Sequence, residues 1–75
     1  MVRLPVLSGH EIIKALEKEG FEVVGQKGSH VRLKKKSDKG IFIVLVPFHK
    51  EVAKGTLMSI IRQSGLSKED FVKLF

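Results

Sequence analysis

Two turn signals in the middle of the sequence enclose one segment of alternating polarity. They are Lys27–Gly28 and Ser37–Gly40, and each contains a glycine, the residue that adopts the positive φ that such turns often need. Between them, Ser29–Lys35 predicts a strand, because its apolar and polar side chains alternate at first. Phe21–Gln26 and Ile41–Val46 predict strands on either side. Short turns join neighbouring strands in antiparallel fashion, so the sequence predicts a three-stranded meander.

The predicted central strand has one apolar face and one basic face. Successive side chains of a strand point to opposite sides. Val31 and Leu33 therefore share one side, and His30, Arg32 and Lys34 share the other. The apolar side needs cover from the rest of the chain, while the basic side is expected to stay open.

A helix is predicted before the strands, at about Gly9–Glu19. Ser8 and Glu11 form a capping box, in which each side chain accepts a hydrogen bond from the backbone of the other residue. Gly20 is suited to end the helix in the left-handed conformation. The preceding segment, Met1–Leu7, is expected to be extended because it contains a proline. The apolar stripe of the helix consists of Ile12, Ile13, Ala15 and Leu16.

A second helix is predicted to follow a loop at Lys50–Gly55, with Thr56 as its N-cap and Gly65 at its end. Ser67 and Asp70 form a weaker capping box, which predicts a short final helix. The stripe of the second helix is Leu57, Ile60, Ile61 and Ser64, and the final helix carries Phe71, Leu74 and Phe75.

Together these elements predict an α+β two-layer sandwich in one domain that covers residues 1–75. The order is helix, three antiparallel strands, helix and a short terminal helix. Both main helices must bury their apolar stripes, and the sheet is the available partner. This outline is similar to that of a double-stranded-RNA-binding domain, with one basic sheet face left open.

The third predicted strand, Ile41–Val46, is apolar at every position although the meander places it at an edge of the sheet. Edge strands are normally protected by charged side chains. We therefore expect a partner chain, or a second copy of the chain in a homodimer, to cover the outer face or the edge of this strand.

The positive charge of the chain is concentrated around the second predicted strand. The formal net charge is +6, and Gln26–Lys39 contains six basic residues against one aspartate, which leaves five positive charges there. A local basic patch is typical of proteins that bind a polyanion, and a pI near 9.9 favours nucleic acid. An anionic membrane is disfavoured, because no predicted helix combines a basic face with bulky aromatic residues.

The absence of cysteine excludes disulfides, thiolate metal ligands and a thiol nucleophile. No apolar run reaches the roughly 18 residues of a membrane span, and the start of the sequence lacks the pattern of a signal peptide. We expect a soluble cytoplasmic protein that needs no cofactor.

His30 is the strongest candidate for catalysis. An imidazole has its ordinary pKa near neutrality, so it can both accept and donate a proton. Ser29, Arg32 and Lys34 are close to it and can hold a phosphate. RNA supplies its own nucleophile, the ribose 2′-hydroxyl, so its cleavage needs neither a metal nor an activated protein nucleophile. The alternative is that His30 is only a solvated residue on a polar strand face.

The remaining candidates also have structural alternatives: the clustering of charge favours phosphate contact for the lysine run, and packing is favoured for His49. Lys34–Lys36 can contact a phosphate backbone or form a solvated face. His49 follows the third strand and is either a second proton carrier or a packing residue, while the spacing of His10 and the other histidines does not support a metal site. Without tyrosine or tryptophan, little is available to stack on single-stranded bases. The phenylalanines, expected mostly in the core, are Phe21, Phe42, Phe48, Phe71 and Phe75.

Several short motifs occur in a fixed order along the chain. They are Ser8–Gly9, Gly20–Phe21, Gln26–His30, Pro47–His49, Lys54–Leu57 and Gly65–Ser67. The ordered set, which extends from about Ser8 to Phe71, closely resembles the HicA-type mRNA interferase toxins, also called the YcfA-like family. The resemblance implies a double-stranded-RNA-binding-like fold, ribonuclease activity with the active-site histidine at His30, and a HicB-type antitoxin that covers the active-site region.

The residues and the resemblance together predict a metal-independent endoribonuclease toxin that acts on mRNA, with His30 as general base or acid. A non-catalytic RNA-binding module that uses the same face is the main alternative. A protein-interaction domain whose apolar strand extends a partner's sheet is a third. The predicted RNA-binding residues are Lys27, Gly28, Ser29, Arg32, Lys34 and Lys35.

Overall fold

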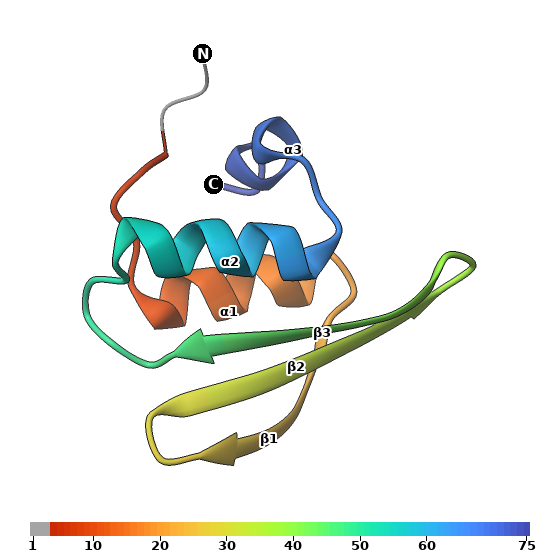
Figure 1. Ribbon diagram of the computed structural model, residues 1–75, viewed down its shortest axis with the longest axis horizontal. Coiled ribbons are helices and arrows are strands. Elements are labelled where there is room, and N and C mark those ends of the chain that lie inside the picture. The colour runs from red at the N-terminus through yellow and green to blue at the C-terminus, as the bar shows by residue number, and fades with distance from the viewer. Residues whose placement is uncertain (1–3) are drawn as a thin grey trace.

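The computed structural model describes residues 4–75, so Met1–Arg3 of the predicted lead-in lie outside the described residues. The elements follow the order α1–β1–β2–β3–α2–α3 (Figure 1). Their bounds are α1 Gly9–Lys18, β1 Glu22–Lys27, β2 His30–Ser37, β3 Gly40–Pro47, α2 Lys54–Ser64 and α3 Lys68–Val72. The predicted α+β fold is confirmed, with a three-stranded antiparallel sheet in the order β1–β2–β3.

Local hydrogen bonds define both ends of α1, as the sequence predicts. The Ser8 hydroxyl accepts the backbone N–H of Glu11 at 3.1 Å, and the Glu11 carboxylate accepts the N–H of Ser8 at 2.9 Å. After the last turn, Gly20 has a φ of 101°, which an L-residue with a side chain rarely adopts. The capping box and the glycine therefore fix the length of this helix.

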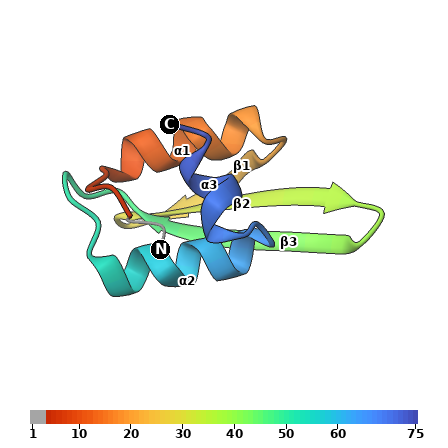
Figure 2. The same ribbon diagram turned by 90° about the horizontal axis from the view of Figure 1, so that it is seen from above.

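One face of the sheet forms the core with the helices. Val31 and Leu33 of β2 are buried together with Val44 and Val46 of β3. The helices pack against this face and alongside β3, and leave the opposite face of the sheet uncovered (Figures 1 and 2). The predicted stripes of α1 and α2 are buried in the same core. The helices thus supply the cover that the apolar side of β2 requires.

Part of the free edge of β3 is covered from within the chain. The backbone N–H of Leu45 donates to the Gln63 side-chain oxygen of α2 at 3.1 Å. The outward side chains of β3 remain exposed: Ile41 is 57% exposed, Ile43 49% and Leu45 47%. The apolar residues that a partner is expected to cover are therefore on the open face of the sheet.

The predicted start of α2 is wrong by three residues. The helix begins at Lys54, with Ala53 as an N-cap that makes no side-chain hydrogen bond, and Thr56 lies inside its first turn. The cause is a contact from outside the local sequence. Val52 is buried, and its N–H donates to the Leu7 carbonyl at 2.8 Å, so the chain is anchored just before the helix begins.

The phenylalanines divide between the core and the surface. Phe21 and Phe71 are buried, and Phe42 is partly buried against Gly65. Phe48 and Phe75, however, are about half exposed, which contradicts their assignment to the core. Phe48 follows β3 and Phe75 ends the chain, so both lie beyond the elements that enclose the core. Among the described residues, no helix is both long and apolar enough to span a membrane.

Candidate functional site

The turn between β1 and β2 brings the predicted site residues together. Lys27 and His30 are directly paired across the two strands, and Arg32 lies two residues further along the same side of β2. Gly28 has a φ of 60°, and its carbonyl accepts a hydrogen bond from the Gln26 side-chain amide at 3.2 Å. The turn therefore sets His30 between two cationic side chains.

These three residues line one open depression of about 450 Å³ on the exposed face of the sheet. Its lining includes Gly25, a position without a side chain that is paired with Arg32. A methyl group added at Gly25 would have no atom within 4 Å, so this part of the depression is unobstructed. The depression is therefore open beside the residue that is paired with Arg32.

Three residues of the depression were not predicted as site residues: Gly25, Gln26 and Leu45. Strand alternation gives no signal for Gln26, because pairing outward from the turn places it opposite Val31, whose side chain is buried in the core. Gly25 is opposite Arg32 in the regular pairing that runs outward from the turn, and the register shifts only beyond this pair, between Val23 and Gly25. That irregularity has no signature in the alternation of the sequence.

The far side of His30 is held by the end of β3. His30 pairs with Pro47, and the next residue, Phe48, donates its backbone N–H to the Ser29 carbonyl. This bond fixes the turn residue immediately before His30. The position of His30 therefore depends on both neighbouring strands.

The predicted lysines do not all accompany His30. Lys34 is on the same side of β2 but lines a second depression together with Lys36 and Glu22. Lys35 lies on the opposite side, where its Nζ is 5.7 Å from the centre of the Phe21 ring. The structure therefore brings Lys27 and Arg32, rather than the lysine run, next to His30.

His49 does not line the depression that contains His30. It lies instead with His10 and Phe48 around a smaller hollow, and its carbonyl accepts the backbone N–H of Gly9 at 2.8 Å. Its side chain is exposed, so it is not the packing residue that the sequence suggested. His49 and His30 therefore line different depressions.

The cations of the open face are not neutralised by neighbouring acids. Across residues 4–75, the ion pairs within 4.0 Å are Lys14–Glu17 and Lys73–Asp70, both on helices or their ends. Lys27 and Arg32 take part in neither. The depression consequently offers an exposed imidazole and two available positive charges, a set suited to proton transfer next to a bound phosphate.

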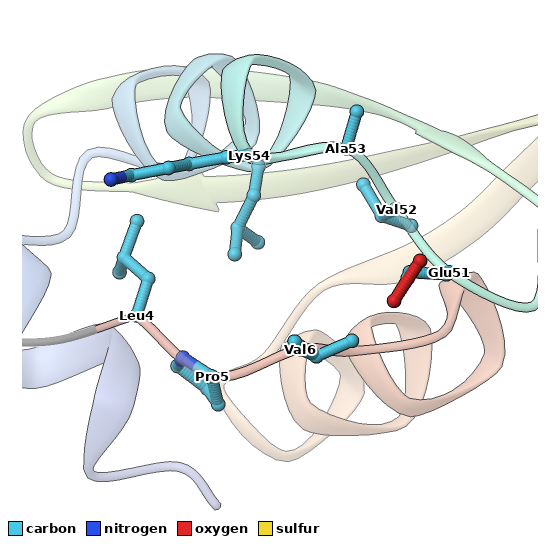
Figure 3. A pocket seen from close by; sticks show the side chains of 8 residues that line it. Leu4, Pro5, Val6, Glu51, Val52, Ala53 and Lys54 are labelled. Atoms are coloured by element: carbon cyan, nitrogen blue, oxygen red, sulfur yellow. The ribbon is translucent and has the colours of Figure 1, made fainter.

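A different pocket, of about 360 Å³, lies between the lead-in and the start of α2 (Figure 3). Leu4, Pro5 and Val6 form one side of it, and Val52–Lys54 forms the other. It contains no histidine, and most of its lining is apolar. Its mostly apolar lining is typical of a groove that packs against another segment. The depression at His30 is therefore the better candidate for an active site.

Comparison with known proteins gives one family. Residues 9–66 of the 75-residue chain match the family described as "HicA toxin of bacterial toxin-antitoxin". The matched segment runs from the start of α1 to just past α2, so it includes the whole sheet and the depression at His30. No curated protein matches the chain.

Proposed function

The chain belongs to the HicA toxin family of bacterial toxin–antitoxin systems, and on that premise we propose that it is an endoribonuclease that cleaves mRNA at the open face of its sheet. Family membership makes it the toxin of a toxin–antitoxin pair, with an antitoxin as partner. The substrate and the chemistry are the proposal. The observation that carries it is the placement of His30 between Lys27 and Arg32 in one open depression.

In this mechanism, the RNA supplies the nucleophile. The His30 imidazole accepts the proton of a ribose 2′-hydroxyl, and the 2′-oxygen attacks the adjacent phosphorus. Lys27 and Arg32 balance the negative charge that develops on the phosphoryl oxygens. The bond from phosphorus to the 5′-oxygen breaks, the leaving oxygen takes up a proton from water, and the His30 imidazolium releases its proton to solvent. The products are a 2′,3′-cyclic phosphate and a 5′-hydroxyl, and no step requires a metal ion.

The remaining cations supply affinity. Lys34 continues the row of positive charge along the open side of β2, and Lys36 extends it towards the second turn. Contacts between such side chains and phosphates give binding that does not depend on base sequence. The row therefore holds a strand of RNA along β2 while the cleaved phosphate lies at its His30 end.

The test compares the wild type with His30→Ala on a long unstructured RNA in EDTA, with circular dichroism to show that both are folded. The proposal predicts cleavage by the wild type and a loss of at least 100-fold in the variant, with RNA binding retained. Lys14→Ala is the control, because Lys14 is a cation of α1 that is paired with Glu17 and lies outside the depression. Equal cleavage by wild type and His30→Ala would refute the assignment of His30.

A non-catalytic RNA-binding module is the second candidate, supported by the same unpaired cations. It predicts salt-sensitive RNA binding without cleavage, unchanged by His30→Ala. The experiment above distinguishes the two, because only the ribonuclease depends on the imidazole.

The antitoxin is proposed to cover the open face of the sheet. The apolar side chains of Ile41, Ile43 and Leu45 are directly paired with Lys36, Lys34 and Arg32 of β2. An exposed apolar row beside a basic row is typical of a protein-binding surface. A partner with apolar and acidic side chains would cover both rows and block His30. A second copy of this chain is the alternative occupant, but it would bring two basic rows together.

A further inference from the structure

Phe48 is an aromatic residue held at the surface beside the turn that carries His30. It is 52% exposed, although aromatic side chains usually contribute to a core. Its backbone is well anchored, because its N–H donates to the Ser29 carbonyl and the neighbouring His49 carbonyl accepts the N–H of Gly9. The exposure of Phe48 is thus part of an ordered junction.

Three segments of the chain meet at this junction: the start of α1, the end of β3 and the β1–β2 turn. Gly9 permits the contact between the first two. A methyl group at Gly9 would overlap the Pro47 carbonyl oxygen and crowd the Cα of Phe48. The backbone of α1 can therefore come this close to Phe48 only with glycine at that position.

The side chains around Phe48 are polar or cationic. The His10 ring meets the Phe48 ring edge to face, with 6.3 Å between their centres and an angle of 86° between their planes. Both rings line a hollow of about 160 Å³, together with Ser8, His49 and Lys50. An aromatic face bordered by imidazoles and a lysine differs from the purely apolar row of Ile41, Ile43 and Leu45.

We propose that Phe48, supported by His10, forms a subsite in which a nucleobase of the RNA stacks next to the phosphate at His30. The subsite rests on the proposed ribonuclease function. Single-stranded RNA is typically held by a basic groove that follows its backbone and by aromatic side chains that stack on its bases. The basic side chains along β2 provide the groove, and Phe48 is an exposed aromatic residue next to the His30 end of that strand. Lys50 supplies charge for the adjoining phosphate.

This arrangement favours RNA over an apolar protein segment as the occupant. A protein segment would gain little from the charged and imidazole groups that surround Phe48, whereas a base with its phosphate uses both. The bond between Phe48 and Ser29 also links the subsite directly to the residue before His30. Stacking at Phe48 therefore positions the RNA chain with respect to the catalytic imidazole.

The test measures binding in the His30→Ala background, so that the RNA stays intact. The probe is a short single-stranded RNA with one 2-aminopurine, whose fluorescence falls when it stacks. Phe48→Leu, which keeps apolar bulk but removes the aromatic face, is expected to weaken binding roughly tenfold and to abolish the fluorescence change. Phe48→Tyr is expected to retain both. Phe75→Leu is the matched control, because Phe75 is similarly exposed but lies at the end of the chain.

Each outcome of this experiment is decisive. If the His30→Ala parent binds the RNA and the added Phe48→Leu substitution changes neither the affinity nor the fluorescence, the subsite alone is overturned. If the His30→Ala parent does not bind RNA and the wild type does not cleave it, both the proposed function and the subsite are overturned. If Phe48→Leu fails to fold by circular dichroism, Phe48→Ile replaces it with the same expected result.

Discussion

Lys27 and His30 face each other across the β1–β2 hairpin, separated in sequence only by the turn residues Gly28 and Ser29. A hairpin fixes this pair more firmly than a loop would, because the cross-strand register determines which side chains are opposite. His30 is paired on its other side with Pro47 of β3. The imidazole that we propose as catalytic is thereby held on a central strand without a long connecting segment.

Lys27 is expected to contribute affinity through a single phosphate contact. Lys27→Ala should weaken RNA binding and reduce the slope of log affinity against log salt by about 0.7, the value for one phosphate of a single strand. The measurement is a salt titration of binding in the His30→Ala background. Lys14→Ala is the control, because Lys14 is paired with Glu17 on α1. An equal slope in Lys27→Ala and its parent would remove Lys27 from the interface.

Gly9 is expected to be essential for the junction between α1 and the end of β3. Gly9→Ala should lower the free energy of unfolding by about 1–3 kcal/mol, because the added methyl group overlaps the Pro47 carbonyl. Gly55→Ala is the matched control. Gly55 lies in α2 with open space around its Cα, so the same substitution there should stabilise the protein by up to about 1 kcal/mol. Urea unfolding of the two variants measures both effects, and equal changes would contradict this account of Gly9.

Ser64 is expected to stabilise the end of α2 through two hydrogen bonds made in the core. Its hydroxyl donates to the Ile61 carbonyl at 2.6 Å and accepts the N–H of Leu66 at 3.2 Å. Ser64→Ala should cost about 1–3 kcal/mol, because the Leu66 N–H loses its partner. Ser59→Ala, at a serine whose bond to Arg62 is exposed, should change stability by less than about 0.5 kcal/mol. A Ser64→Ala variant as stable as the wild type in urea would refute this role.

Ile43 is expected to bind the antitoxin rather than to support the fold. Ile43→Lys should weaken the complex with the cognate antitoxin at least tenfold, because a charge replaces an apolar contact at the proposed interface. Stability should change by less than about 0.5 kcal/mol, since half of the side chain is already in solvent. Val6→Lys, at an exposed valine of the lead-in, is the control. Calorimetry measures the affinity of each protein for the antitoxin. Equal affinities for Ile43→Lys and the wild type would contradict the proposal.

Local signals in the sequence were sufficient for most of the fold. The capping box at Ser8 and the turns around β2 depend on neighbouring residues only, and the elements they predict lie within about two residues of those observed. The start of α2 was missed because it depends on the contact between Val52 and Leu7, which are far apart in sequence. Non-local contacts of this kind leave no mark on local patterns.

The candidate site was predictable to the extent that it follows from strand alternation. Alternation correctly groups His30, Arg32 and Lys34 on the open face, and it also separates Lys35 from them. The prediction that Lys35 belongs to the RNA-binding residues relied on its charge and disregarded this alternation. The exposure of Phe48 was missed for a different reason: hydrophobicity indicates a tendency to be buried, whereas the position beyond the end of β3 decides it.

The most direct test of the account is the identity of the RNA ends that the wild-type protein leaves on a defined single-stranded RNA in EDTA. Attack by the 2′-hydroxyl predicts a 2′,3′-cyclic phosphate on one product and a 5′-hydroxyl on the other, both detectable by mass spectrometry. Products with a 3′-hydroxyl and a 5′-phosphate would contradict the proposed chemistry at His30, and intact RNA would contradict the ribonuclease function itself.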